Sequence, residues 1–113
     1  MVAIGYVPAM PSEFTIRDRP EKSRFETELG DGTFAFAEYK LHDGKIVFTH
    51  TEVPPEHEGQ GIGSALIRYS LNAARERDLK VVPVCPFFAA YIKKHVEEQD
   101  LLDPSSRAKL GLS

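Results

Sequence analysis

The sequence lacks several features that mark specialised classes of protein. A single cysteine, Cys85, excludes an internal disulfide framework and a cysteine-rich zinc site, and we predict no metal. No apolar run approaches the roughly 20 residues that a membrane-spanning helix needs. No Lys or Arg precedes Arg17, which makes the N-terminus a poor signal peptide. These absences predict a cytoplasmic protein without a membrane partner.

The chain also lacks an excess of positive charge. Its 14 Lys and Arg residues stand against 17 Asp and Glu residues, which gives a formal net charge of −3. Domains that bind nucleic acid are usually basic, so no nucleic-acid partner is expected. A length of 113 residues is enough for one domain with a small core.

The first half of the chain has the pattern of three β-strands joined by short turns. Residues 24–29 alternate charged and apolar side chains and end at the turn Gly30-Asp31-Gly32. Residues 33–41 alternate again and end at the turn 42–45. Residues 46–53 are rich in β-branched and aromatic side chains, which favour a strand. We expect an antiparallel meander.

The second half predicts two helices around one more strand. An amphipathic helix is expected from Gly61 to Asp78. Residues 79–85 follow as a short buried strand, in which Pro83 implies an edge position or a break in pairing. Pro86 then opens a helix over residues 87–98. The apolar residues that share one face of the first helix are Ile62, Ala65, Leu66, Tyr69 and Ala73.

The element order is therefore β-β-β-α-β-α, which predicts an α/β fold with a mixed, mostly antiparallel sheet and packed helices. We expect a flexible arm over residues 1–13, in which Val2 to Val7 could add an edge strand. The domain itself would span residues 14–102. Residues 103–113 are rich in Ser, Lys and Gly, and we expect them to fray as a tail.

The segment from Val53 to Leu66 is the most informative part of the sequence. Three glycines at alternate positions, 59, 61 and 63, lie where a strand-like run gives way to a helix. Glycine lets the backbone approach a ligand closely, and the first N–H groups of a helix bind anions. The spacing matches neither a dinucleotide fingerprint nor a P-loop. A phosphate cradle is predicted, with a plain glycine-rich turn as the alternative.

Together these motifs give the chain a resemblance to the GNAT superfamily of acetyl-coenzyme A (acetyl-CoA)-dependent N-acetyltransferases. Within that superfamily it is similar to a group of very small, single-domain proteins. The similarity covers about residues 14–102, and the run from Cys85 to His95 is its most specific part. The segments that carry it are residues 17–26, Phe36-Ala37-Glu38-Tyr39, His50-Thr51-Glu52-Val53-Pro54, residues 59–66, Val82-Pro83-Val84-Cys85-Pro86-Phe87 and Ala89-Ala90-Tyr91-Ile92-Lys93-Lys94-His95.

The resemblance implies where the cofactor would bind. In GNAT folds the pyrophosphate of coenzyme A lies on the turn that opens the central helix, and the pantetheine arm lies between two parallel strands that splay apart. Here those strands would be residues 46–53 and 80–85. A backbone N–H near Val53 would hold the acetyl carbonyl and stabilise the oxyanion. The residues of the turn are Gly59, Gln60, Gly61, Ile62, Gly63 and Ser64.

Four residues are candidates for catalysis, each with a structural alternative. Tyr91 matches the tyrosine that protonates the leaving thiolate in the superfamily, and it could instead be a packing residue. Glu52 and His50 would share one face of a strand as candidate general bases, although His50 could simply pack. Cys85 could carry an acetyl group or be a small buried hydrophobe. Direct transfer of the acetyl group from the thioester to the amine needs no acetylated cysteine. This favours Tyr91 over Cys85 as the catalytic residue.

The sequence departs from the superfamily pattern at two places. Glu58 stands where Arg or Gln is usual, and a carboxylate there would repel pyrophosphate. His95-Val96 replaces a Gly-Phe pair, and too few residues follow for two further strands. Half of the usual acceptor pocket would then be missing. The substrate could be large, or a second copy in a homo-oligomer could complete the site.

The function expected from the resemblance is transfer of an acetyl group from acetyl-CoA to an amine of unknown identity. Two alternatives from other classes remain open. One is a non-catalytic module that binds coenzyme A or an acyl-CoA. The other is an interaction protein that keeps the fold without the ligand.

Overall fold

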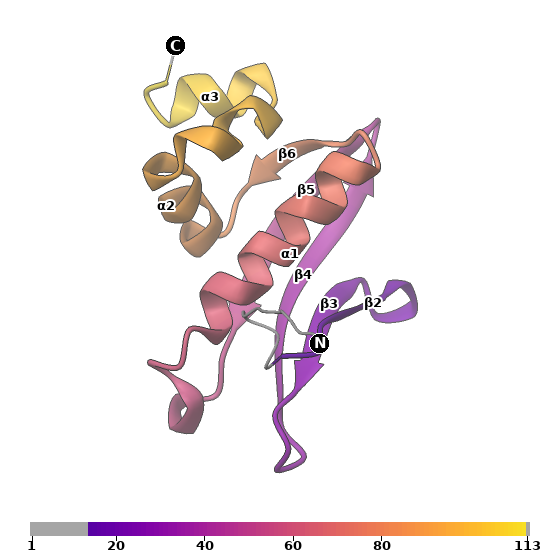
Figure 1. Ribbon diagram of the computed structural model, residues 1–113. Coiled ribbons are helices and arrows are strands. Elements are labelled where there is room, and N and C mark those ends of the chain that lie inside the picture. The colour runs from indigo at the N-terminus through magenta and orange to yellow at the C-terminus, as the bar shows by residue number, and fades with distance from the viewer. Residues whose placement is uncertain (1–13, 113) are drawn as a thin grey trace, which may run out of the picture.

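A computed structural model describes residues 14–112, and its centre is a five-stranded sheet whose strand order follows the chain (Figure 1). The strands are β2 (Arg17–Arg19), β3 (Arg24–Glu28), β4 (Phe34–His42), β5 (Lys45–Glu52) and β6 (Lys80–Pro83). Neighbours from β2 to β5 pair antiparallel, and β6 pairs parallel to β5. This confirms the expected α/β fold with a mixed, mostly antiparallel sheet.

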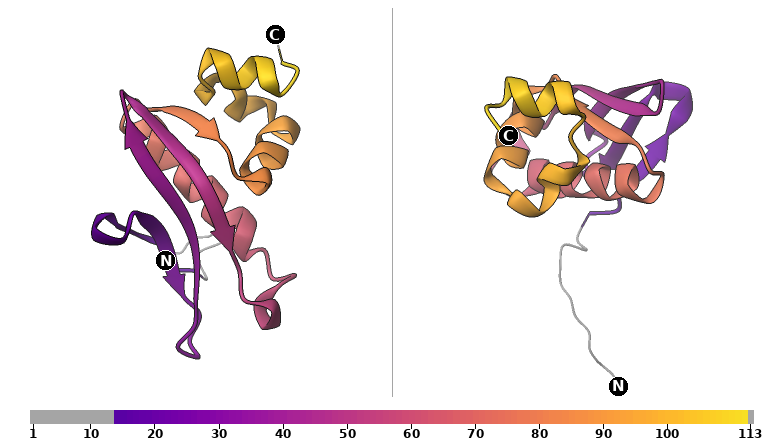
Figure 2. Two further views of the ribbon diagram at one scale, coloured as in Figure 1. Left: turned by 180° about the vertical axis from the view of Figure 1, so that it is seen from behind. Right: turned by 90° about the horizontal axis from the view of Figure 1, so that it is seen from above.

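Helix α1 (Ile62–Glu76) makes the crossover from β5 to β6 and packs along one face of the sheet, as Figure 2 shows. The C-terminal helices group beyond the β6 edge in the same views. They are α2 (Pro86–Lys94) and α3 (Pro104–Lys109), with the 3-10 turn η3 (Val96–Leu101) between them. The other 3-10 turns are η1 (Pro20–Lys22) and η2 (Pro55–His57).

The core lies between the sheet and α1. Ile62 and Leu66 of α1, spaced i, i+4, are almost fully or fully buried, as an amphipathic helix predicts, and Leu71 of the same helix is buried with them. On the sheet, Phe48 stacks on Phe88 of α2, with ring centroids 4.1 Å apart and planes 7° apart. This aromatic contact fixes α2 against β5. Tyr69 differs from the expected apolar face, because it is 39% exposed, although its ring makes a T-shaped contact with the buried ring of Phe25.

The expectation of a fraying tail from Asp103 is wrong, because residues 104–109 form α3. The Asp103 carboxylate is buried and caps this helix by accepting the Ser106 N–H at 3.1 Å. Its own N–H donates to the Val81 carbonyl, which ties the segment to β6. Leu110 and Leu112 pack against the core. An N-cap and two apolar residues therefore anchor this end of the described chain.

Two other boundaries differ from the sequence pattern. Strand β2 was not expected, and it adds an edge beside β3. The predicted helix over residues 87–98 ends at Lys94, because His95 leaves the helical conformation with φ −118° and ψ 89°. Pro83 ends β6 at the edge of the sheet, as predicted. The expected arm over residues 1–13 lies outside the described residues.

Within residues 14–112, no helix is long and apolar enough to cross a membrane. The same part of the chain has no group of three or more His, Cys, Asp or Glu side chains arranged to hold a metal ion.

Candidate active site

The parallel strands β5 and β6 separate before β5 ends. Their pairing runs from Lys45 with Lys80 to Phe48 with Pro83. One more hydrogen bond, from the Cys85 N–H to the Phe48 carbonyl at 2.9 Å, marks the point of divergence. Beyond it β5 continues along β4 to residue 52, while the chain after β6 turns away into α2. An opening is thus left beside the second half of β5.

A bulge in β5 lies at the same point. Tyr39 of β4 faces Phe48, and its neighbour Glu38 faces His50, so the register skips Thr49. An extra residue of this kind bends a strand and increases its twist. The bulge thus coincides with the point at which β5 stays paired with β4 and leaves β6.

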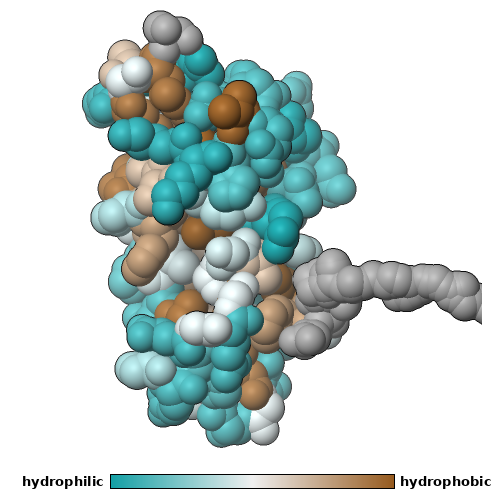
Figure 3. Space-filling model, turned by 60° about the vertical axis from the view of Figure 1, so that its left-hand side comes forward, coloured by the Kyte–Doolittle hydropathy of each residue, from teal (hydrophilic) through white to brown (hydrophobic). Residues whose placement is uncertain are grey.

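The opening holds a pocket with a volume of about 670 Å³. Figure 3 shows this side of the molecule, where a pale band of weakly polar residues crosses between two more hydrophilic regions. Four elements contribute to the lining. They are the end of β5 with residues 51–53, the following loop with 57–59 and 61, α1 with 62–64 and 67, and α2 with Phe87 and Tyr91.

The loop that enters α1 is shaped by two glycines with positive φ, Gly59 at 86° and Gly61 at 82°. Side chains other than glycine rarely take such values. Gly61 is the N-cap of α1, and no side chain among the described residues caps the helix. The first bond inside the helix runs from the Ala65 N–H to the Gly61 carbonyl. The N–H groups of residues 62–64 therefore have no partner within the helix, and these residues line the pocket. This arrangement suits an anion.

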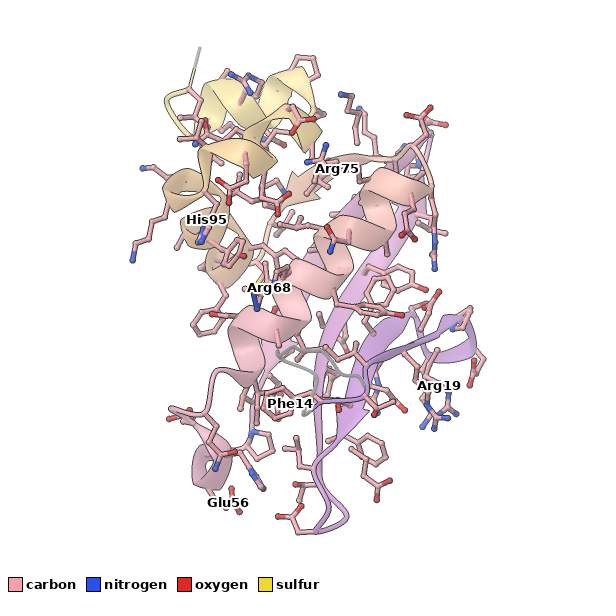
Figure 4. All side chains as sticks on the ribbon, in the orientation of Figure 1. Phe14, Arg19, Glu56, Arg68, Arg75 and His95 are labelled. Carbon is pink, nitrogen blue, oxygen red and sulfur yellow. The ribbon has the colours of Figure 1, made fainter. Side chains whose placement is uncertain are left out.

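Tyr91 reaches the pocket from α2. Its ring stacks on that of His95 at 3.8 Å between centroids, and His95 Nδ1 lies 2.7 Å from the Tyr91 carbonyl oxygen. Burial raises the pKa of Tyr91, Arg68 on α1 lowers it, and Glu98 and Glu97 raise it, with a net upward shift. Figure 4 shows Arg68 on α1 and His95 at the end of α2. A phenol with a raised pKa keeps its proton at neutral pH and can donate it to a stronger base.

The other catalytic candidates are placed differently. Glu52 lines the pocket, and its Oε1 lies 3.1 Å from His50 Nε2. Both side chains are more than half exposed, and Thr51 is buried on the opposite face, as the alternation predicts. Cys85 is only 2% exposed, with its Sγ 3.3 Å from Thr51 Oγ1. His50, Cys85 and Gln60 lie outside the pocket lining.

Sequence reasoning missed four residues that line the pocket: Thr51, His57, Ile67 and Phe87. Phe87 is 65% exposed at the start of α2, which is unusual for so large an apolar side chain. His57 directly precedes Glu58. The sequence analysis therefore identified the correct loop but did not identify His57 as a site residue. Of the predicted catalytic and cofactor-binding residues, eight lie together here: Glu52, Val53, Gly59, Gly61, Ile62, Gly63, Ser64 and Tyr91.

Comparison with known proteins assigns the chain to a family. The family model of the GCN5-related N-acetyl-transferases matches residues 24–101, which is more than half of the chain. Among solved structures, the chain is similar to the solution structure of a GCN5-like candidate N-acetyltransferase from Staphylococcus aureus. That match has a TM-score of 0.64 and 27% sequence identity, and it covers 82% of this chain and 91% of the other. The sequence has no significant match among curated proteins.

Proposed function

Because the chain belongs to the GCN5-related N-acetyl-transferase family, we propose that it transfers an acetyl group from acetyl-CoA to an amine. One observation carries the proposal: the uncapped N-terminus of α1 opens onto a pocket of about 670 Å³ at the point where two parallel strands diverge. The first feature suits a pyrophosphate, and the second suits a long, narrow ligand arm.

Each step of the reaction has a residue that could perform it. Acetyl-CoA, when bound, supplies a thioester whose carbonyl an amine can attack. The N–H groups of residues 62–64 would bind the pyrophosphate, because they lack partners within the helix. Glu52 would accept the proton that the amine loses, with His50 beside it at 3.1 Å. Tyr91 would give its proton to the departing thiolate, so that charge does not accumulate on the sulfur.

Binding of acetyl-CoA should raise the melting temperature of the protein. Ligand at about 100 times its dissociation constant stabilises the folded state by roughly 2.7 kcal/mol. For a domain of this size that corresponds to a shift of roughly 10 °C or more. A thermal-shift series with increasing acetyl-CoA, supported by calorimetry, measures it. No shift and no heat at saturation would refute the proposal.

Glu58 should weaken coenzyme binding, because it is one of the residues that line the pocket beside the proposed pyrophosphate site and it carries a negative charge. We expect Glu58→Gln and Glu58→Arg to tighten binding of coenzyme A. The gain should be on the order of 1 kcal/mol, about fivefold, and should shrink as salt screens the repulsion. Titration calorimetry at low and high salt measures it.

Glu56 supplies the matched control for this prediction. It belongs to the same loop, in η2, and lies outside the pocket lining (Figure 4). Glu56→Gln should change the affinity less than Glu58→Gln does. Equal affinities for wild type and both Glu58 variants at low salt would show that the Glu58 side chain turns to solvent.

A further inference from the structure

The loop that carries the anion-binding glycines touches a distant part of the chain. We define the cradle loop as residues 54–61, between β5 and α1. His57 in this loop lines the pocket with a side chain that is 18% exposed. Its Nε2 lies 2.9 Å from Oδ2 of Asp31, which belongs to the turn between β3 and β4, 26 positions earlier. The contact therefore joins the cradle loop to the β3–β4 hairpin.

Asp31 is itself held in place. Its Oδ1 accepts hydrogen bonds from the Thr33 N–H at 3.0 Å and from the Thr33 hydroxyl at 2.5 Å. One oxygen of the carboxylate thus anchors the hairpin turn, and the other faces His57. The backbone bonds of the cradle loop, such as that from the His57 N–H to the Pro54 carbonyl, are local. Local bonds shape the loop, whereas the contact with Asp31 fixes where it lies.

Each side chain of the pair favours the charged form of the other. The hydrogen bond to Asp31 raises the pKa of His57, burial opposes it, and Gln60 and Glu56 add smaller upward effects. Thr33 first and His57 second hold the pKa of the Asp31 carboxyl well below its usual range. When both side chains are charged their charges cancel, so the pair brings no net positive charge to the pocket. Its contribution to binding is therefore one of position.

We propose that His57 is a positioning residue for the coenzyme, and that its contact with Asp31 holds the cradle loop so that the loop and the first turn of α1 face the same phosphate. The inference rests on the proposed function, because it concerns that same site. Without the contact, the loop must be ordered when the ligand binds, and this lowers the affinity. Losing one charge-assisted hydrogen bond should weaken binding of coenzyme A about tenfold.

A mutant cycle tests the pairing. Coenzyme A is titrated calorimetrically into wild type, His57→Gln, Asp31→Asn and the double variant. Each single variant should bind about tenfold more weakly, and the double variant should bind no more weakly than either, because the two changes remove one contact. His42→Gln is the matched control, since it alters an exposed His–Asp pair at the end of β4 that lies outside the pocket lining. Melting curves without ligand establish that every variant folds.

A pH series separates this role from a general structural one. Dephospho-coenzyme A is the probe, because it lacks the 3′-phosphate that titrates in the same range. The protonated form of His57 binds Asp31 best, so wild-type affinity should fall as pH rises through the raised pKa of His57. Asp31→Asn should move this midpoint to lower pH, and His57→Gln should remove it. NMR titration of the His57 ring locates the same midpoint directly.

The outcomes are distinct. Wild-type binding of coenzyme A with unchanged affinity in both single variants would overturn the inference and leave the proposed function standing. A wild-type midpoint that survives in His57→Gln would overturn it as well. No binding of coenzyme A by the wild type would overturn the proposed function and, with it, this inference.

Discussion

Replacing Tyr91 with phenylalanine is expected to lower the rate of acetyl transfer by roughly 10²–10⁴, the usual contribution of one acid–base group. The substitution keeps the ring that stacks on His95 and lines the pocket, and it removes only the hydroxyl. The affinity for coenzyme A should therefore stay near that of the wild type. Burial raises the pKa of this phenol and so keeps the proton in place until a thiolate forms.

The measurement is release of free coenzyme A thiol with a verified amine acceptor, together with calorimetric binding. Cys85→Ala is the comparison variant and should keep substantial activity, because the Cys85 thiol is buried against Thr51 and lies outside the pocket lining. Wild-type turnover in Tyr91→Phe would contradict the assignment. So would an acetylated Cys85 that forms and decays at the catalytic rate, as mass spectrometry would detect.

Replacing Gly63 with valine is expected to abolish binding of acetyl-CoA while the protein stays folded. Gly63 is helical, and a Cβ there would meet Val53 Cγ2 at 3.8 Å, an ordinary van der Waals distance. Two further methyl groups would extend over the first turn of α1, where the pyrophosphate is proposed to bind. The folded state should tolerate the change, and the ligand should not.

Gly63→Ala is the matched control. It adds a single carbon that fits, and alanine favours a helix over glycine by roughly 1 kcal/mol. Gly61 is a less informative position, because its φ of 82° strains any other side chain and so mixes loss of folding with loss of binding. Melting temperature and calorimetric affinity are measured for both Gly63 variants. Wild-type affinity in Gly63→Val would show that the anion site lies elsewhere.

Local pattern predicted those features that depend on neighbouring residues. The alternation in β3, β4 and β5 and the helical spacing of α1 placed these elements within two residues of their observed bounds. The glycines of the cradle loop were placed for the same reason, because backbone conformation at a turn is decided over a few residues. The family model matches residues 24–101, the part of the chain that contains these strands, the helix and the glycines.

Features that depend on distant partners could not be predicted in this way. Asp31 and His57 are 26 residues apart, and either alone looks like an ordinary surface residue. The bulge at Thr49 shows only when β5 is aligned with β4. The Asp103 side chain is also buried, and nothing near it in the sequence indicates that its segment pairs with β6.

Glu26 shows the same limit inside a correctly predicted strand. The alternation of β3 places it on the face away from α1, which suggests exposure, yet it is 1% exposed. Arg24 Nε donates to its Oε1 at 2.8 Å, and Arg19 Nη1 donates to its Oε2 at 2.9 Å. Long arginine stems can cover a neighbouring side chain while their charged ends pair with it. The order of polar and apolar residues along the strand does not show that two arginine side chains cover Glu26.

The early end of the pairing between β5 and β6 has a mechanical consequence. One wall of the pocket belongs to β5 and α1, and the other belongs to α2, which follows β6. Four residue pairs, the hydrogen bond from the Cys85 N–H to the Phe48 carbonyl and the stacked rings of Phe48 and Phe88 join these two parts near the base of the opening. A ligand that contacts both walls would add a further link between α2 and the sheet. Motion of α2 relative to the sheet would therefore be more restricted in the bound state than in the free state.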